Sequence, residues 1–356
     1  MSGAAERDLM GKVQTVLGPI DGGEMGVTIT HEHLLMTACH IAREPEGEPD
    51  RTLYHEPVSM KILGRLRYGK LVNLDNCQLH SVDTAIFEAG LFKAAGGQTI
   101  VDATSLGIGR HPVGLAHIAR ATGLNIVMGA SFYVEETYPA ELELGRKSEG
   151  EIAAMIARDI LVGVGESGIR AGLIGEVGCS WPLTKIEQKI LRASARAQRM
   201  TGAPLMVHPG RDRAAPAQIA KILDAAGADL SRTIICHIDR TLDSPELLNE
   251  LAVMGCALEY DLFGFEHSYY PWVLPVDMPN DLGRLRWLRW LIDKGYLSRI
   301  VISHDICFKD KLSTYGGAGY AHILNNVVPL MRTKGFTEYE IAAILVQNPR
   351  RLFSFA

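Results

Sequence analysis

The chain has 356 residues, a formal net charge of −5, and a composition that is 47% hydrophobic and 22% charged. This is the profile of a folded globular protein, and it offers no basic face for nucleic acid. No segment has the roughly 18 uninterrupted apolar residues of a membrane span, and residues 1–12 lack the apolar stretch of a secretory signal. We therefore expect a cytoplasmic protein that binds neither nucleic acid nor a membrane.

Eight short apolar runs of strand length recur along the chain. They lie at 26–30, 98–103, 124–130, 171–175, 203–208, 232–237, 256–260 and 299–304. Most segments between them place apolar residues at a 3.6-residue period, which is typical of amphipathic helices. Strands that alternate with helices are parallel, and continuous apolar runs indicate burial on both faces. Eight such units predict an α/β fold of the (β/α)8 TIM barrel type, although the pattern alone also allows a doubly wound open sheet.

Glycines shortly before four of the predicted strands are expected to end the preceding helices. A left-handed residue at the helix C-terminus turns the chain back, and glycine adopts that conformation most readily. The four candidates are Gly97, Gly123, Gly202 and Gly255.

Three connections are longer than one helix requires. The first contains an insertion at 40–95 between strands one and two, and the others lie at 261–281 and 307–320. All three begin where strands end, so in a barrel they rise over the carboxyl-terminal face, where barrel enzymes keep their active sites. We expect them to cover a site in a single domain that spans 1–356.

Histidines and acidic residues stand at the ends of several predicted strands. His31 and His33 follow the first strand, and residues two apart on an extended backbone point to the same side. Such a pair alone is weak evidence, but companions end strands four, five, six and eight: Glu176, His208, His237 and Asp305. A buried carboxylate is costly unless it is paired or binds a metal, and this ligand set suits zinc or a similar divalent ion. An ion pair with arginine remains open for either acid.

Several motifs around these residues resemble one family. They are THEHL at 30–34, IGEVGCSWPLT at 174–184, VHPGR at 207–211, CHIDR at 236–240 and SHDI at 303–306. They resemble the phosphotriesterase family of the amidohydrolase superfamily, and within it the branch of phosphotriesterase-related proteins. The resemblance runs nearly end to end, and it implies a metal-dependent hydrolase with two divalent ions, zinc being the first choice.

The resemblance also implies a role for each ligand. The more buried ion would be held by His31, His33 and Asp305, and the more exposed ion by His208 and His237. Glu176 would bridge both ions, where organophosphate-hydrolysing members have a carboxylated lysine. A hydroxide between the ions would attack a carbonyl or phosphoryl centre, and Asp305 would be the catalytic base. The glutamate moves the expected chemistry away from triester hydrolysis.

Two further residues are candidates for substrate binding. Two divalent ions, two carboxylates and a hydroxide leave a small positive formal charge, which favours a small anionic substrate. Arg240 could hold a carboxylate, sulfonate or phosphate through paired N–H donors. An ion pair with Asp239 or Asp243 is an equal alternative. Tyr133 resembles the family tyrosine that reaches toward the substrate, although packing would also explain it.

The remaining polar and aromatic residues are less informative. His304 precedes Asp305 and should face away from it, in the core or behind the ligands. An apolar wall over the site, or ordinary packing, would account for Trp181, Phe263, Phe265, Tyr269, Tyr270 and Trp272. The six cysteines include no CxxC pair and are expected to be reduced thiols.

The branch that the chain resembles is associated with hydrolysis of the amide in N-acetyltaurine and similar N-acyl amino acids, and this is the function that we expect. A lactonase or a phosphotriester or phosphoester hydrolase is the alternative, because the same hydroxide attacks those centres. A metal-binding barrel without catalysis is disfavoured, since a structural site closes its coordination and needs no second ion. A homodimer is expected from the resemblance alone.

Overall fold

The computed structural model describes residues 9–68, 72–267, 270 and 277–356. Eight parallel strands form one sheet in the order β12-β11-β10-β9-β8-β7-β6-β3. Their bounds are β3 Thr28–Glu32, β6 Thr99–Asp102, β7 Asn125–Ala130, β8 Leu173–Gly178, β9 Leu205–His208, β10 Thr233–Ile235, β11 Ala257–Tyr260 and β12 Ile300–Ile302. The sheet closes because the backbone N–H of His31 donates to Ser303 Oγ at 2.9 Å, which joins β3 to the end of β12. The predicted barrel is confirmed, and the open-sheet alternative is wrong.

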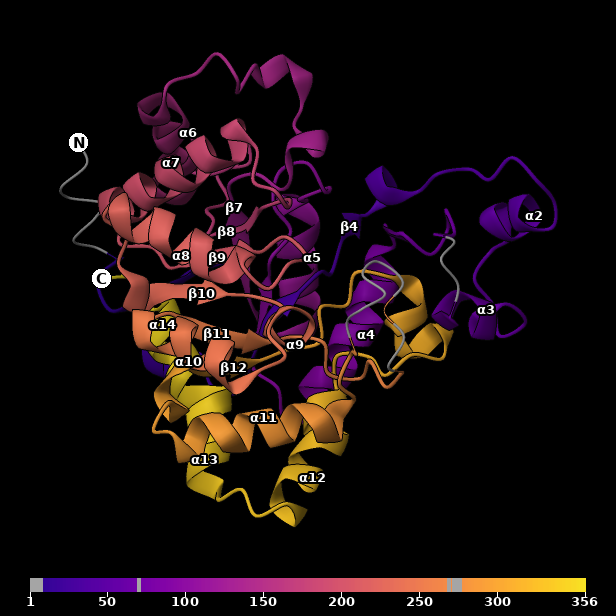
Figure 1. Ribbon diagram of the computed structural model, residues 1–356. Coiled ribbons are helices and arrows are strands. Elements are labelled where there is room, and N and C mark those ends of the chain that lie inside the picture. Colours follow the sequence, from indigo (N-terminus) through magenta and orange to yellow (C-terminus); the bar gives the residue numbers. More distant parts are fainter. Residues whose placement is uncertain (1–8, 69–71, 268–269, 271–276) are drawn as a thin grey trace.

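Helices surround the strands on all sides (Figure 1). Those that follow the strands are α4 Val82–Ala94, α5 Pro112–Thr122, α6 Glu149–Leu161, α7 Lys185–Thr201, α8 Ala215–Ala225, α9 Ile238–Thr241, α10 Pro245–Met254 and α11 Asp281–Asp293. The last helices are α12 Val328–Thr333, α13 Glu338–Ala342 and α14 Asn348–Phe353. A π-helical turn at Ile323–Val327 leads into α12, and another at Ala343–Gln347 joins α13 to α14. None of the helices in the described ranges is long and apolar enough to cross a membrane.

The barrel interior is apolar toward the amino ends of the strands. Each strand from β6 to β12 contributes one fully or almost fully buried side chain to this layer: Val101, Val127, Leu173, Met206, Ile234, Ala257 and Val301. Val13 and Met25, from the region of a hairpin of β1 (Lys12–Thr15) and β2 (Gly18–Asp21), pack against the layer together with Phe353 of α14. Sequence periodicity did not predict this hairpin. The hairpin covers the amino end of the barrel. Polar residues lie at the opposite, carboxyl end.

Glycine ends three of the four helices as predicted. The C-terminal residues with positive φ are Gly123 (+66°), Gly202 (+70°) and Gly255 (+110°). The prediction for Gly97 is wrong, because α4 ends at Ala94 with Ala95 as its C-cap, and the positive φ of +101° belongs to Gly96. Gly97 serves packing instead, since a Cβ there would lie 2.3 Å from the ring of Phe92.

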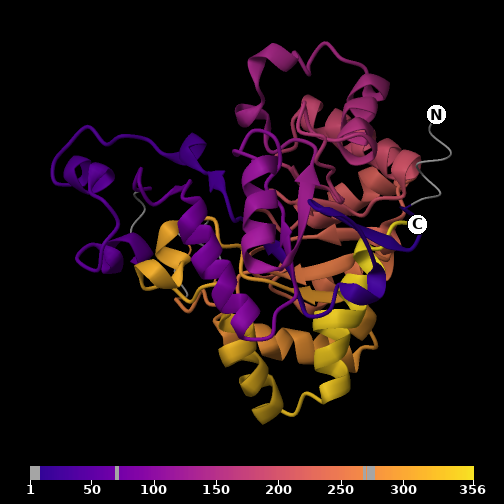
Figure 2. The ribbon, with the colours of Figure 1, turned by 180° about the vertical axis from the view of Figure 1, so that it is seen from behind.

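The insertion projects from one side of the barrel (Figure 1, Figure 2). It contains α2 (Asp50–His55), α3 (Leu63–Tyr68) and β5 (Gln78–Leu79), which pairs antiparallel with β4 (Met36–Thr37) just before the insertion. The connection at 307–320 lies against α4, where the buried carboxylate of Glu88 accepts hydrogen bonds from the backbone N–H of Ser313 at 3.1 Å and of Thr314 at 2.7 Å. Part of the third long connection, at 268–269 and 271–276, lies outside the described residues.

Candidate metal centre

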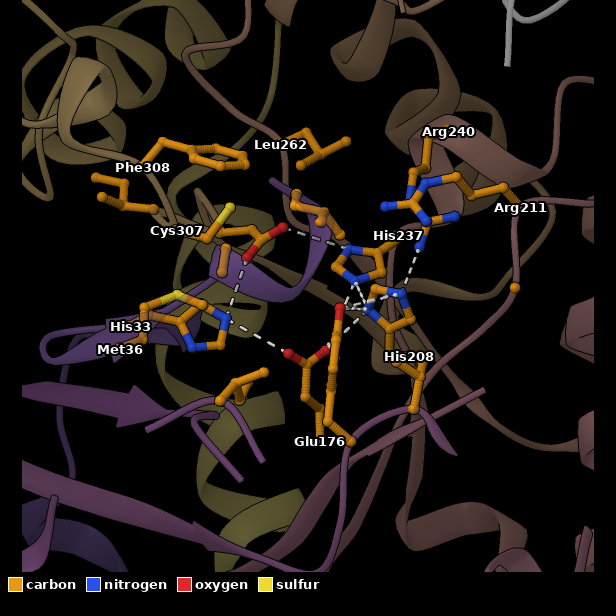
Figure 3. Close-up of a pocket in the computed structure, with 18 of the residues that line it drawn as sticks. His33, Met36, Glu176, His208, Arg211, His237, Arg240, Leu262, Cys307 and Phe308 are labelled. Carbon is orange, nitrogen blue, oxygen red and sulfur yellow. Dashed lines mark hydrogen bonds and ion pairs between the residues drawn. The ribbon is translucent and has the colours of Figure 1, made fainter. Parts of the chain in front are cut away.

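The six predicted ligands lie together at the carboxyl end of the barrel. They come from five strands or the loops directly after them, because parallel strands of a barrel end at one common rim. In Figure 3, Glu176 of β8 lies between His33 on one side and His208 and His237 on the other. Residues far apart in the sequence thus face one another across the barrel mouth.

One group of ligands forms around His33. Its Nε2 lies 3.4 Å from Glu176 Oε1 and 3.3 Å from Asp305 Oδ1. The Nε2 of His31 lies 3.5 Å from Glu176 and 3.7 Å from Asp305, and it is fully buried without a hydrogen bond in the described structure. An unpartnered buried nitrogen is costly. Two imidazole nitrogens and carboxylate oxygens that converge in this way fit a divalent cation between them.

A second group forms on the other side of Glu176. His208 Nδ1 lies 3.1 Å from Glu176 Oε2 and 2.8 Å from His237 Nε2, while that nitrogen of His237 lies 3.7 Å from the same oxygen. Burial and the neighbouring His237 lower the pKa of His208 to about 3, so its imidazole is neutral, the form that binds metal. Glu176 is therefore shared by both groups.

The carboxylates at the centre are ionised although they are buried. Burial raises the pKa of Glu176, but the histidines around it, His31 first, hold it well below the usual range. Burial lowers the pKa of His33, but hydrogen bonds to Asp305 and Glu176 outweigh this and raise it to about 9. Binding of a cation by His33 at neutral pH must therefore displace a proton.

Glu32, between the two histidines of β3, ties that strand to the loop that carries Asp305. Its Oε1 accepts hydrogen bonds from Ser303 Oγ at 2.6 Å and from the backbone N–H of His304 at 2.9 Å. His304 Nε2 accepts the backbone N–H of Ile323 at 3.1 Å, so Nδ1 carries the proton and donates it to Glu32 at 2.6 Å. His304 is thus buried and bonded to Glu32, and it also lines the cavity.

Sequence reasoning missed a carboxylate that contacts both groups of ligands. Asp261 Oδ1 lies 2.8 Å from His237 Nδ1, and its Oδ2 lies 3.2 Å from His31 Nδ1. Glu259, two residues earlier, lies 3.5 Å from the same nitrogen of His31 and accepts a hydrogen bond from Cys236. Two acids spaced by two residues at the end of an apolar strand point to the same side. That spacing was the available signal.

A cavity of about 820 Å³ opens above the cluster. Of the predicted aromatic wall, four members line the cavity: Trp181, Phe263, Phe265 and Tyr270. Tyr269 and Trp272 lie outside the described residues. Apolar side chains of Met36 and Phe308 lie on the side of the cavity opposite to two arginines (Figure 3). The cavity therefore has one apolar and one cationic side.

The two alternatives to substrate binding by Arg240 are both wrong. Asp239 accepts a hydrogen bond from Arg284 at 2.8 Å, and Asp243 pairs with Arg213 at the surface. Each of these two aspartates therefore pairs with an arginine that is farther from it in the sequence than Arg240.

Arg240 instead lines the cavity. Its Nη2 donates to the carbonyl oxygen of Pro209 at 3.0 Å and lies 3.3 Å from His208 Nε2, and it has no ion pair with a carboxylate of the described chain. Arg211, which sequence reasoning missed, lies beside it (Figure 3) and donates through Nε to Tyr270 at 2.9 Å. Two guanidinium groups on one side of the cavity attract an anion.

Tyr133 also faces the centre. Its hydroxyl oxygen lies 3.3 Å from His208 Nδ1 and 3.4 Å from Nε2, and its ring packs edge-on against that of His40 at 5.6 Å between centroids. Burial, followed by the charge of Glu176, raises its pKa well above the usual value. The hydroxyl therefore remains protonated and can donate a hydrogen bond in the cavity.

Comparisons with known proteins cover nearly the whole chain. A family model described as the phosphotriesterase family matches residues 11–353. N-acetyltaurine hydrolases from Bos taurus and from Homo sapiens are each 44% identical over 351 residues, which is 98% of this chain and 99% of each relative. A solved resiniferatoxin-binding protein from Rhodobacter sphaeroides is 38% identical with a TM-score of 0.92, over 97% of this chain and 95% of that one.

Proposed function

Because this chain belongs to the phosphotriesterase family, we propose that it is a metal-dependent hydrolase that cleaves the amide bond of N-acetyltaurine or a related N-acyl amino acid. One observation carries the proposal. The cluster around Glu176 and the two arginines at positions 211 and 240 line the same cavity. A substrate with a hydrolysable carbonyl near an anionic group fits this arrangement.

We propose two divalent ions, zinc by preference, for the two groups of ligands that share Glu176. When bound, such ions polarise a carbonyl oxygen and lower the pKa of a water molecule. Four imidazole nitrogens and the oxygens of two carboxylates are the donor types that zinc prefers. The unpartnered Nε2 of His31 supports a cation at this position.

Asp305 is the residue best placed to move a proton. Its side chain is 14% exposed, against 7% or less for the other five candidate ligands. Burial opposes its ionisation, but His33, by a hydrogen bond, and the other histidines lower its pKa, so it is a carboxylate that can accept a proton from water and return it to the leaving amine. The Tyr133 hydroxyl donates a hydrogen bond to a substrate oxygen in the same cavity.

Arg240 and Arg211 hold the anionic end of the substrate in this proposal. Arg240 Nη2 lies only 3.3 Å from the ring of His208. The sulfonate of N-acetyltaurine is separated from the amide nitrogen by two carbons. The short distance between the arginines and the cluster therefore matches the short distance between the sulfonate and the amide of this substrate.

The proposal is tested by incubating the metal-loaded protein with N-acetyltaurine and measuring released taurine. We expect release by the natural protein and none above background by Glu176→Ala. Equal release by the two proteins would contradict the proposal.

The anion site is tested separately with Arg240→Gln. Loss of a charged hydrogen bond worth about 1.5–3 kcal/mol raises KM or lowers kcat/KM for N-acetyltaurine by roughly 10- to 150-fold. The neutral amide N-ethylacetamide should be hydrolysed equally by both proteins. Arg213→Gln is the matched control, because Arg213 pairs with Asp243 at the surface. An equal loss on the neutral amide would show that Arg240 does not act through the anion.

A panel of lactones and aryl phosphotriesters addresses the alternative hydrolases. A higher kcat/KM on a lactone or a phosphotriester than on N-acyl amino acids would replace the amide proposal. Metal analysis that finds no divalent ion would favour a barrel without catalysis.

We also propose a cytoplasmic location, which the six free thiols support. The homodimer expected from the family stays a prediction.

A further inference from the structure

Two cysteine sulfur atoms lie in contact beside the cavity. The Sγ atoms of Cys39 and Cys77 are 3.1 Å apart. Cys39 begins the short 3-10 helix η2 (Cys39–Ile41), and Cys77 directly precedes β5. The backbone N–H of Ala38 donates to the carbonyl oxygen of Cys77 at 2.8 Å. This bond continues the pairing of β4, which ends at Thr37, with β5, which begins at Gln78. Backbone hydrogen bonds therefore hold the two thiols together, although they are 38 positions apart.

The two thiols differ in reactivity. Cys77 is buried, and its Sγ donates to the carbonyl oxygen of Leu74 at 3.2 Å, so the Cys39 thiol is the donor in the contact between the sulfurs. Burial, with the neighbouring Cys39, raises the pKa of Cys77 to about 12. Cys39 is partly exposed. A small oxidant therefore reaches Cys39 first, and the sulfur of Cys77 is already in position to attack it.

We propose that Cys39 and Cys77 form a reversible oxidation site that hydrogen peroxide converts into a disulfide. The Cys39 thiolate attacks peroxide, the O–O bond breaks, and hydroxide leaves to give a sulfenic acid. Cys77 then attacks Cys39 Sγ, the S–O bond breaks, and the departing hydroxide takes up the thiol proton. Two thiols and one peroxide give one disulfide and two waters, with two electrons transferred. A dithiol reverses the reaction by exchange.

The structure can accommodate this bond with little movement. A disulfide has an S–S distance of about 2.05 Å, so the sulfurs must approach by only about 1 Å. No second sulfur contacts the other four cysteines, all of which lie in the described ranges. Cys307 also lines the cavity and is partly exposed, yet it has no sulfur partner. It therefore serves as a matched control.

The oxidation site adjoins the wall of the cavity. Ala38, His40 and Ile41 line the cavity on either side of Cys39, and the ring of His40 packs against Tyr133. A disulfide would fix this part of the wall to the segment of the insertion that leads into β5. The predicted ligands of the metal centre are not touched, so the inference does not depend on the proposed substrate.

The test is oxidation of the full-length protein with a small excess of hydrogen peroxide, followed by intact mass and peptide mapping under non-reducing conditions. We expect the loss of two hydrogen atoms, a peptide pair linked through Cys39 and Cys77, and reversal by dithiothreitol. Cys307→Ser should behave in the same way, and Cys39→Ser should form no crosslink. The oxidised natural protein should also melt up to roughly 5 °C higher, because the bond closes a loop of the unfolded chain.

Two results would overturn the inference. One is oxidation of Cys39 to the sulfinic acid in the natural protein without a linked peptide, which would show that Cys77 cannot reach it. The other is the same loss of two hydrogen atoms in Cys39→Ser, which would place the disulfide elsewhere. Mapping of the natural protein decides the question even if a variant fails to fold.

Discussion

Two clusters of buried charge at the carboxyl side of the barrel differ in how they are neutralised. In the Arg284 network, which comprises Arg284, Asp239, Asp281 and His322, opposite charges touch directly. Arg284 donates to Asp239 at 2.8 Å and to Asp281 at 3.0 Å, and His322 Nε2 lies 2.7 Å from Asp281. In the candidate metal centre no arginine or lysine contacts Glu176 or Asp305 within the described chain.

The difference separates a structural cluster from a functional one. The Arg284 network neutralises its own carboxylates, and such buried pairs hold segments in place. The candidate metal centre has two ionised carboxylates among imidazoles and faces the cavity. Its carboxylates are balanced by imidazoles such as that of His33, which can release a proton when a cation binds. A perturbed, open cluster of this kind is the feature that indicates a functional site.

Replacement of Glu176 is expected to have the largest effect on activity. Glu176→Ala removes the carboxylate that both groups of ligands share, so bound metal is lost and kcat/KM falls on the order of 10³-fold or more, equivalent to several kcal/mol. The measurements are kcat/KM and metal content by mass spectrometry. Metal content and activity close to those of the natural protein would remove the distinction between the two clusters.

Replacement of Arg284 should act on stability instead. Arg284→Met leaves Asp239 buried without its counter-charge and Asp281 with His322 as its partner, which lowers the free energy of unfolding by about 3–5 kcal/mol. Urea titration measures this loss, and the metal content of the folded fraction should be unchanged. If stability is unaffected while metal is lost, then the Arg284 network belongs to the functional site.

Asp261 is predicted to support both groups of ligands. Asp261→Asn removes the charge that orients His237 and faces His31, and metal affinity should fall by roughly 10- to 100-fold. Competition with a chelator of known affinity measures this. Asp281→Asn is the control, because that carboxylate belongs to the Arg284 network and should leave metal affinity unchanged. Equal losses in the two variants would mean a general effect of destabilisation.

A partly buried ion pair outside both clusters is expected to have the smallest effect. Arg289 Nη1 and Nη2 lie 2.8 and 2.9 Å from the carboxylate of Glu340, and this hydrogen bonding lowers the pKa of Glu340 from 4.5 to about 2. Because the pKa of Glu340 is lower in the folded than in the unfolded protein, its ionised carboxylate stabilises the fold at a pH above the unfolded-state pKa. This stabilisation is lost as the pH falls from the unfolded-state pKa to the folded-state pKa. Because solvent still reaches both side chains and screens the charges, we expect a contribution of only about 1 kcal/mol.

Thermal melting tests this pair. The difference in Tm between the natural protein and Glu340→Gln should shrink as the pH is lowered from about 6 to about 3. A difference that stays constant with pH would show that the charge of Glu340 does not contribute.

The eight strands and the cluster of candidate ligands could be predicted from the sequence. Strand runs are visible because both faces of a parallel strand are buried, so the apolar pattern is continuous and local. His31, His33, Glu176, His208, His237 and Asp305 stand directly after such runs, and the barrel topology brings strand ends to one rim. A local pattern and one topological rule were sufficient for this part.

Partners of individual side chains could not be predicted in this way. Asp239 and Asp243 are near Arg240 in the sequence, yet they pair with Arg284 and Arg213. Asp261 facing His31 and the contact of Cys39 with Cys77 also join distant segments. Such partners depend on how far each side chain reaches through space once the loops are packed, and sequence separation carries no information about that distance. The sequence by itself determined the barrel and the chemistry gathered at its rim, whereas only the tertiary structure decided which charges are neutralised inside the protein and which remain open to the cavity.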